Sequence, residues 1–236
     1  MFKIKLKPRL AAVASFVEKG SVADIGTDHA QLPIYLVQLG YPCALASDIN
    51  EGPCQRARTN IYANGLHGKI KVVCCPGLDA VDEFKPDNIV IAGMGGEMIV
   101  SILEASEYPK SSGCRLVLQP QSMQDVLRRY LSENGFCIDR ETVVFDGGKY
   151  YQVLAARYDG TARTLTEPEY KLGELNIRRA STDPTEVDIA WLEGQKKVAE
   201  RRIAGREGSC AESPEQAADR ELVSVIENIT NKAERV

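Results

Sequence analysis

The sequence has few of the features that mark a membrane or secreted protein. No apolar run in it approaches the roughly 20 residues that a membrane-spanning helix needs. The start of the chain is basic, but neither an apolar segment nor a small-residue cleavage site follows it, so no secretory signal is expected. These absences favour a soluble protein of the cytoplasm.

Residues that bind metal ions are also scarce. The chain has two histidines and seven irregularly spaced cysteines, with no Cys-x-x-Cys pair, so no metal site is expected. A disulfide between the adjacent Cys74 and Cys75 would be strained. Free, buried thiols in a reducing compartment are therefore the expected state of the cysteines.

The chain lacks an excess of positive charge as well. Its 236 residues include 29 basic and 33 acidic side chains, which gives a net charge of -4. Residues 1–159 carry 17 basic and 18 acidic side chains, and residues 160–236 carry 12 and 15. This balance argues against a protein that coats nucleic acid through net charge. An RNA partner would have to be held by local clusters, such as Lys3, Lys5, Lys7 and Arg9.

Strand-like and helix-like segments alternate over the first two-thirds of the chain. This alternation predicts a doubly wound α/β sheet, and Gly147-Gly148 between two strand-like segments predicts a hairpin that adds an antiparallel edge. Strands are expected at 22–25, 43–47, 69–74, 88–92, 115–118, 137–145 and 151–157. Helices are expected at 33–39, 53–64, 98–105 and 122–134.

The character of the sequence changes near residue 160. Beyond it there is no convincing strand, and helices are expected at 167–181, 185–205 and 214–236, with a loop rich in Gly, Ser and Pro at 205–214. Two long helices joined by a loop predict an antiparallel, coiled-coil-like hairpin. We therefore expect an α/β domain over residues 1–159 and a helical domain over residues 160–236.

The loop after the first predicted strand carries acidic side chains. Asp24 ends the strand, Gly26 makes the turn, and Thr27, Asp28 and His29 begin the next segment. One glycine is too few for the Gly-x-Gly-x-x-Gly pattern that seats a pyrophosphate, which disfavours an NAD-dependent oxidoreductase. Two carboxylates suit a cationic ligand such as S-adenosylmethionine, which has an ammonium and a sulfonium. The simpler alternative is that Thr27 or Asp28 caps a helix.

A second acid closes the next predicted strand. Asp48 follows Gly26 by 22 positions, and a carboxylate at about this separation can accept hydrogen bonds from both ribose hydroxyls of a nucleoside. Ile49 is placed to pack on the adenine ring. An acid here could also serve only as a turn residue. Acids at two successive strand ends favour the nucleoside interpretation.

Two later loops also follow strands. Gly93-Met94-Gly95-Gly96-Glu97 has three glycines in four residues, which indicates unusual backbone angles or close approach of a substrate. Gln119 and Gln121 flank a proline after the fifth predicted strand. Their amides suit a base edge or a phosphate, although a merely polar loop explains them equally well.

Taken together, these segments resemble the bacterial TrmK family. Its members are S-adenosylmethionine-dependent tRNA methyltransferases that act on N1 of adenine 22. The resemblance runs from about residue 9 to residue 156 and rests on segments 22–30, 46–50, 93–97, 118–121 and 148–151, of which Gly93-Met94-Gly95-Gly96-Glu97 is the most specific. The helical C-terminal region also looks like the second domain of the family. The chain departs from the family at Cys75-Pro76-Gly77-Leu78, where members have a Gly-Asp-Gly-Leu-like turn.

The resemblance implies a Rossmann-like methyltransferase domain with S-adenosyl-L-methionine as cofactor. The cofactor site would comprise Asp24, Gly26, Thr27, Asp28, His29, Asp48, Ile49, Asn50, Gly77, Leu78, Gly93, Met94 and Gly95. Because N1 of adenine has a free lone pair, no general base is required, but the base must be unpaired or flipped out. Asp28 is the first candidate to orient the ring and His29 the second, though both could be cofactor ligands or structural residues.

A tRNA substrate would need contacts of its own. The expected ones are Arg9, Gln119, Gln121, Lys197, Arg201 and Arg202. The last three lie in a helical segment with interleaved glutamates, so they could equally form a solvated face. A methyltransferase of the same fold that acts on a small molecule or a protein, and a non-catalytic RNA- or nucleotide-binding adaptor, are the alternative functions. The sequence does not indicate an oligomeric state.

Overall fold

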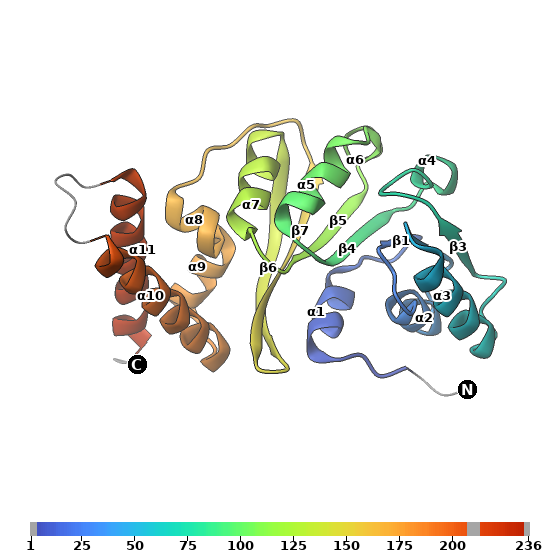
Figure 1. Cartoon of the computed structure of the whole chain (residues 1–236), viewed down its shortest axis with the longest axis horizontal. Coiled ribbons are helices and arrows are strands. Elements are labelled where there is room, and N and C mark those ends of the chain that lie inside the picture. Colours follow the sequence, from blue (N-terminus) through green and yellow to red (C-terminus); the bar gives the residue numbers. More distant parts are fainter. Residues whose placement is uncertain (1–3, 207–212, 234–236) are drawn as a thin grey trace.

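The protein is built on one mixed β-sheet. The structure is a computed structural model that describes residues 4–206 and 213–233. Seven strands lie in the order β3-β2-β1-β4-β5-β7-β6, with β1 to β5 parallel and β7 antiparallel to both neighbours (Figure 1). They are β1 Val22–Ile25, β2 Ala44–Asp48, β3 Ile70–Cys74, β4 Asn88–Met94, β5 Arg115–Pro120, β6 Phe136–Asp146 and β7 Lys149–Tyr158. The predicted doubly wound sheet with an antiparallel edge is confirmed.

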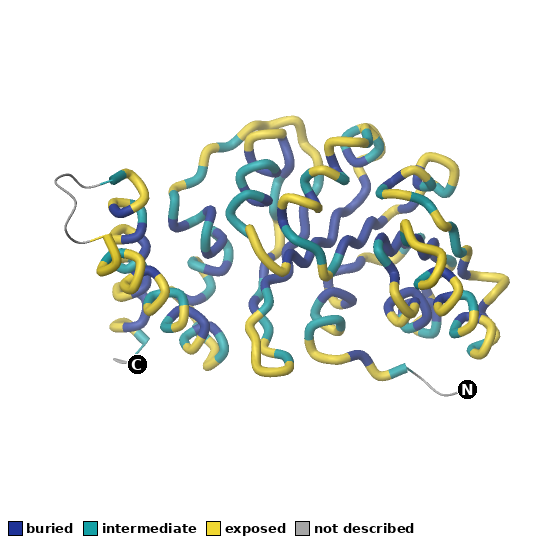
Figure 2. The backbone as a smooth tube through the Cα atoms, in the orientation of Figure 1, coloured by how far each residue is buried: buried dark blue, intermediate teal, exposed yellow. Residues whose placement is uncertain are grey.

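Helices cover both faces of this sheet. Those of the α/β region are α1 Pro8–Phe16, α2 Gln31–Gln38, α3 Glu51–Ala63, α4 Val81–Phe84, α5 Gly96–Glu104, α6 Tyr108–Ser111 and α7 Gln124–Glu133. Val90 packs with residues of α1 to α3 on one face, and Ile89 and Ile91 pack with α5 and α7 on the other. Successive residues of a strand point to opposite faces, so β4 is buried on both sides, as its apolar run predicts. Figure 2 shows the sheet as a buried layer between half-exposed helices.

The hairpin of β6 and β7 is longer than its attachment to the sheet. Strand β7 pairs with β5 only through 154–156, whereas the β6–β7 ladder runs from Phe136 and Tyr158 to Asp146 and Lys149. Gly147 and Gly148 close it in the left-handed region, at φ of 57° and 83°, where a side chain would be strained. The outer half of the hairpin therefore projects past the sheet (Figure 1).

The C-terminal region is helical. It consists of α8 Glu167–Leu172, α9 Glu174–Thr182, α10 Glu186–Gly205 and α11 Pro214–Ala233. Ion pairs join Lys196 to Glu227 and Arg202 to Asp219, so α10 and α11 run antiparallel, as predicted. Apolar residues of these helices pack against Val143 of β6. The expected loop at 207–212 and the last helical residues at 234–236 lie outside the described residues.

The prediction of one continuous helix at 167–181 is wrong, because Gly173 separates α8 from α9. Its φ is 91°, which an L side chain rarely adopts, and a Cβ there would overlap the carboxylate of Glu141. The buried Arg128 of α7 donates to the carbonyl of Tyr170 at 3.0 Å and pairs with Glu141 at 2.7 Å. Side chains of the α/β region thus bind the end of α8 and fix the position at which α8 ends and α9 begins.

The cysteines form no disulfides within the part of the chain that the structure describes. All six cysteines in the described ranges are free thiols. Cys54 and Cys114 are buried, but Cys74 is exposed, so the expectation of buried thiols is wrong for Cys74. Among the helices of the described ranges, none combines the length and the apolar character needed to cross a membrane.

Candidate cofactor and active site

A cavity of about 350 Å³ opens where β1 and β4 end. Strand β1 lies between β2 and β4, so the strand order reverses at this point. In open α/β sheets, ligands bind beyond the carboxyl ends of the strands at such a switch point. The predicted site residues that the structure brings together around it are Arg9, Asp24, Gly26, Thr27, Asp28, His29, Gly93 and Gln121.

Asp24 lies at the base of this cavity with no cation to balance it. Its side chain is buried, and burial raises the pKa of Asp24 from 3.8 to about 7, while the neighbouring Thr27 hydroxyl offsets only part of this shift. No basic side chain among the described residues forms an ion pair with it. A buried carboxylate without a cationic partner is costly to ionise, so the cavity suits a ligand that brings a positive charge.

Asp28 and His29 touch each other at the mouth of the cavity. The Asp28 carboxylate lies 3.2 Å from Nε2 of His29 and accepts from Nε of Arg56 in α3 at 3.0 Å. Asn60 of the same helix donates to the His29 carbonyl at 3.0 Å. Helix α3 therefore holds this loop through Arg56 and Asn60. The sequence did not indicate this role for Arg56, because the contact depends on tertiary packing.

The end of β2 combines an acid with an exposed apolar side chain. One carboxylate oxygen of Asp48 accepts from the backbone N–H of Asn50 at 2.8 Å. Ile49 is 66% exposed, which is high for an isoleucine. Strand β2 pairs with β1, so these residues end beside the turn at Gly26. The remaining carboxylate oxygen and the bare isoleucine suit a ribose and a base.

Two glycines keep the backbone of the site open. Gly26 has φ of 76°, and a Cβ there would overlap the terminal methyl group of Met94. Gly93 has φ of 86°, and the Arg9 guanidinium and the Gln121 amide lie 3.7 Å from where its Cβ would be. The positive φ at both positions strains any L side chain and favours glycine, and the bare backbone lets a ligand approach closely. Gly95 precedes α5 as its N-cap residue.

Arg9 connects the cavity to the hairpin. Its Nη1 donates to Oε1 of the buried Gln119 at 2.6 Å, its guanidinium lies 5.6 Å from the ring centroid of Tyr151, and its backbone N–H donates to Asp146 at 3.1 Å. Arg9 and Gln121 thus line the cavity, whereas Gln119 is buried behind Arg9 and does not line it. Sequence reasoning missed Tyr151 and Asp146 as site residues, although segment 148–151 carries part of the family resemblance.

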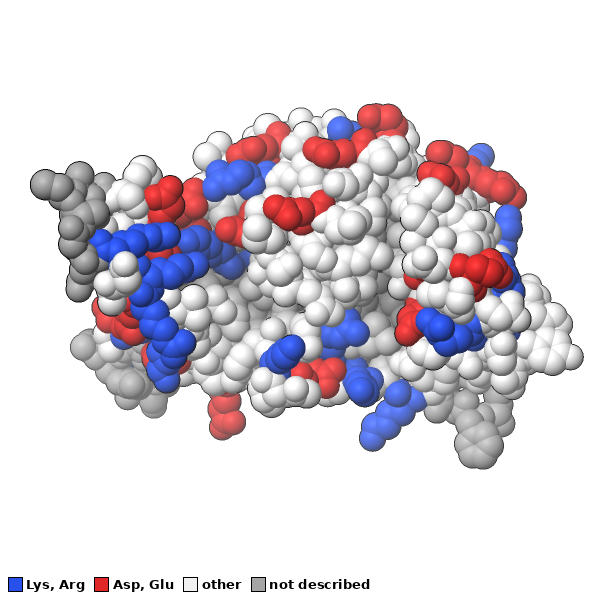
Figure 3. Space-filling model, viewed as in Figure 1, with Lys and Arg blue, Asp and Glu red and all other residues white. Residues whose placement is uncertain are grey.

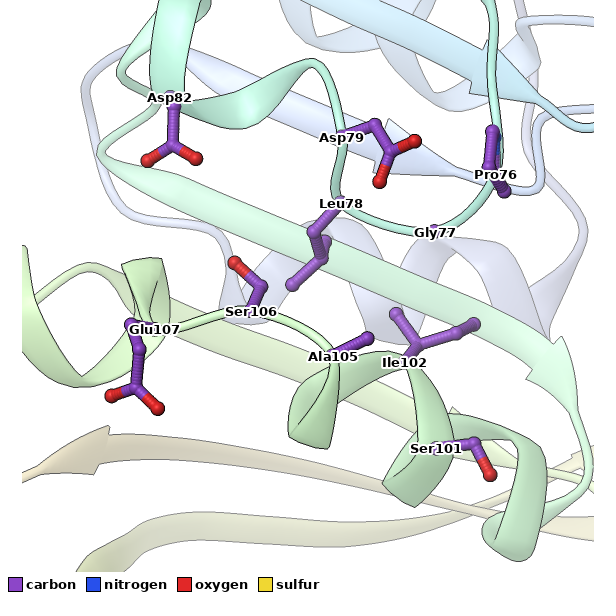
Figure 4. A pocket seen from close by; sticks show the side chains of 10 residues that line it. All are labelled: Pro76, Gly77, Leu78, Asp79, Asp82, Ser101, Ile102, Ala105, Ser106 and Glu107. Atoms are coloured by element: carbon purple, nitrogen blue, oxygen red, sulfur yellow. The ribbon is translucent and has the colours of Figure 1, made fainter.

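Gly77 and Leu78 lie elsewhere. They line a second hollow of about 440 Å³, between the turn after β3 and helices α5 and α6, which shares no lining residue with the Asp24 cavity. Figure 4 shows Leu78 extending from the turn towards α5, with the acidic side chains of Asp79, Asp82 and Glu107 around the rim. Leu78 is 4% exposed and belongs to the core on this side of the sheet, so it forms the buried floor of the hollow.

The three basic residues predicted on α10 differ in their surroundings. Arg202 pairs at 2.8 Å with Asp219, which is buried and also binds Lys171 and Arg206. Lys197 and Arg201 are exposed, and no acidic side chain in the described ranges lies within ion-pair distance of either. Arg202 therefore has a structural role in the helical region, whereas the other two cations face solvent.

Comparisons with known proteins agree with this geometry. Residues 6–154 match a family described as a methyltransferase domain. The tRNA (adenine(22)-N(1))-methyltransferase of Bacillus subtilis (strain 168) is 37% identical over 170 residues, which cover 68% of this chain and 71% of that protein.

Solved structures extend the likeness to the whole chain. Sp1610 of Streptococcus pneumoniae, solved in complex with S-adenosyl-L-methionine, is 32% identical with a TM-score of 0.79, over 94% of this chain and 97% of that one. TrmK of M. capricolum, solved with S-adenosyl-homocysteine, is 25% identical with a TM-score of 0.75, over 97% and 98%. The sheet order, the acidic residues at the strand ends and the open glycine turns agree with these comparisons. This chain belongs to the TrmK family of tRNA (adenine(22)-N(1))-methyltransferases.

Proposed function

We propose that this protein methylates N1 of adenine 22 in tRNA in the cytoplasm, with S-adenosylmethionine as the methyl donor. The observation that carries the proposal is the buried, unbalanced carboxylate of Asp24 beside the bare backbone of Gly26 and Gly93. Within a chain of the TrmK family, this arrangement is suited to a cationic nucleoside cofactor.

The residues at the strand ends fit that cofactor. Asp24 would hold its cationic methionine end, Asp48 its ribose, and the exposed side chain of Ile49 its adenine ring. When bound, S-adenosylmethionine supplies an electrophilic methyl group. The assignment of Gly77 and Leu78 to the cofactor site stays a prediction, since they line a separate hollow.

The contribution of the protein to the reaction is orientation and charge. The lone pair at N1 needs no deprotonation, so the residues must align the base, and alignment can contribute about 7–11 kcal/mol in favourable cases. Positive charge develops on the adenine as the new bond forms. The Asp28 carboxylate, held by Arg56, is placed to accept a hydrogen bond from the exocyclic amine and to stabilise that charge, with His29 beside it.

A methyl-transfer assay tests the proposal. The protein is incubated with methyl-labelled S-adenosylmethionine and an unmodified tRNA transcript, and the RNA is then digested to nucleosides. We expect labelled N1-methyladenosine, and none from a matched transcript in which adenine 22 is replaced by guanine.

The controls distinguish the competing functions. Calorimetry first establishes that the cofactor binds. Cofactor binding without N1-methyladenosine would refute the proposal, and label on protein or on a small molecule would favour a methyltransferase of the same fold with another substrate. Absence of both transfer and cofactor binding would favour an adaptor.

A further inference from the structure

The tip of the β6–β7 hairpin carries an aromatic pair that the core does not explain. Phe145 and Tyr150 face each other across the two strands, with ring centroids 5.0 Å apart. Phe145 is 47% exposed and Tyr150 is 38% exposed. A cross-strand aromatic pair stabilises the hairpin, and the exposed faces of these two rings are available for contact with something outside the chain.

The hairpin tip is held in place rather than free. Val144 and Val153 pack with the core cluster beneath α1, and Val143 packs with the helical region on the other face. The Asp146 carboxylate accepts from the backbone N–H of Arg9 near the start of α1. The aromatic pair is therefore presented at a fixed position by both parts of the molecule.

The same tip is connected to the active-site cavity. Tyr151, next in sequence to Tyr150 and on the opposite face of the strand, lies beneath the Arg9 guanidinium. Arg9 in turn lines the cavity together with Gly93 and Gln121. Arg9 therefore links the cavity to the hairpin tip, and the aromatic pair lies on the face of the two strands opposite Tyr151.

Exposed lysines lie at the tip and in the segment before α1. Lys149 begins β7, and Lys5 and Lys7 precede α1. All three are exposed, and none pairs with an acidic side chain of the described ranges. Figure 3 shows basic side chains gathered over α1, the segment before it and the hairpin tip, along one edge of the molecule. Their charge is complementary to a phosphate backbone.

We propose that Phe145 and Tyr150 stack on an unpaired nucleobase next to the target adenine, while Lys149, Lys5 and Lys7 contact the adjoining phosphates. This inference rests on the proposed function and adds a surface that holds the RNA strand at the cavity. Methylation at N1 requires the adenine to leave its pair and its stack, which exposes the neighbouring base. An exposed aromatic pair offers that base a new stacking partner, worth about 1–3 kcal/mol.

Single substitutions at the tip test this surface. Because both rings are exposed, Phe145→Ala and Tyr150→Ala should leave the fold and cofactor affinity unchanged. We expect each to raise the KM for tRNA by at least about fivefold, with little change in kcat, which corresponds to about 1 kcal/mol or more. Tyr62→Ala is the matched control, since Tyr62 is 74% exposed on α3, and it should not change the KM.

A conservative variant adds a direct readout of stacking. Phe145→Trp should keep the wild-type KM, and its emission should be quenched on addition of tRNA, relative to the wild type with its single, buried Trp191. Lys149→Ala should lower the slope of log affinity against log salt by about 1, whereas Phe145→Ala should leave that slope unchanged.

The outcomes separate this inference from the proposed function. If the wild-type protein forms N1-methyladenosine and both alanine variants keep the wild-type KM, the stacking surface is refuted while the function stands. If the wild-type protein forms none, the proposed function itself fails. Equal effects of Tyr62→Ala and Phe145→Ala would also refute a specific role for the tip.

Discussion

At the scale of single residues, Asp24 is the position whose chemistry depends most on the fold. Its place after a strand is readable from the sequence, and the same holds for Asp48. The burial of Asp24 cannot be predicted from the sequence in the same way, because it depends on β1 lying between β2 and β4. The same limit applies to Asp28, whose partner Arg56 lies 28 positions away on α3. The position of a residue along the chain thus predicts whether its side chain lines the site. Tertiary packing then determines whether that side chain is buried and which charged residue it pairs with.

The pKa of Asp24 has a direct consequence for stability. The folded protein raises this pKa from 3.8 to about 7, so the folded state binds the proton more tightly than the unfolded chain does. The contribution of Asp24 to stability is therefore present in full below pH 4 and is lost as the pH rises towards 7. A cation in the cavity reverses this preference, because it stabilises the ionised form.

Cofactor binding should consequently depend on pH. Between pH 5 and pH 7 the carboxylate must release a proton to pair with the cationic ligand, so we expect the affinity for S-adenosylmethionine to rise by up to about tenfold per pH unit. Titration calorimetry at pH 6, in two buffers of different ionisation enthalpy, should detect release of about one proton.

The matched variant removes the titrating group. Asp24→Asn keeps the shape of the side chain, and we expect it to bind the cofactor more weakly, with an affinity that does not vary between pH 5 and pH 7. If the wild-type protein bound S-adenosylmethionine with the same affinity at pH 5 and at pH 7, Asp24 would not face the cationic part of the cofactor.

At the scale of elements, the strands were more predictable than the helices. Each predicted strand is present within two residues at both ends, because apolar β-branched runs and glycine turns are local signals. The break between α8 and α9 was missed because its cause is not local. Gly173 lies within a helical pattern, and the Glu141 carboxylate that occupies the space of a side chain comes from β6. Helix α1 and the short helices α4 and α6 were also not expected.

Replacing Gly173 tests that explanation. Gly173→Ala puts a Cβ into the Glu141 carboxylate at a φ of 91°, so we expect it to lower the free energy of unfolding by about 2–4 kcal/mol. Chemical denaturation followed by circular dichroism measures the change. Glu141 also pairs with the buried Arg128, so the variant cannot relax by moving this side chain at low cost.

The control for this variant is a glycine inside a helix. Gly194 lies in α10 with open space around its Cβ position, so Gly194→Ala should raise the free energy of unfolding by about 0.5–1 kcal/mol. If both alanine variants shifted stability in the same direction, the contact with Glu141 would not be what separates α8 from α9.

At the scale of the whole molecule, the distribution of charge matters more than its sum. The chain carries a net charge of -4, yet Figure 3 shows basic side chains gathered over α1 and the hairpin tip and again over α10 and α11, on the same face. The division into domains at residues 159 and 160 stays a prediction. The two regions nevertheless share buried contacts, since Arg128 of α7 donates to the carbonyls of Tyr170 and Leu172 in α8.

Lys197 and Arg201 are the residues through which the helical region is expected to contact tRNA. They are four positions apart on α10, hence on one face, and neither is neutralised by an acid in the described ranges. Arg202 is excluded from the test because it pairs with the buried Asp219. We expect the double variant Lys197→Ala/Arg201→Ala to raise the KM for tRNA and to lower the slope of log affinity against log salt by about 1–2.

The matched control has to remove an exposed lysine far from the expected path of the tRNA. Lys85 is exposed and precedes β4, at the opposite end of the parallel strands from the cavity. Lys85→Gln changes the net charge by one unit without touching either basic cluster, so it should leave the salt dependence nearly unchanged. If the double variant had no larger effect than Lys85→Gln, the basic face of α10 would be only solvated, and the hairpin tip and α1 would have to hold the tRNA by themselves.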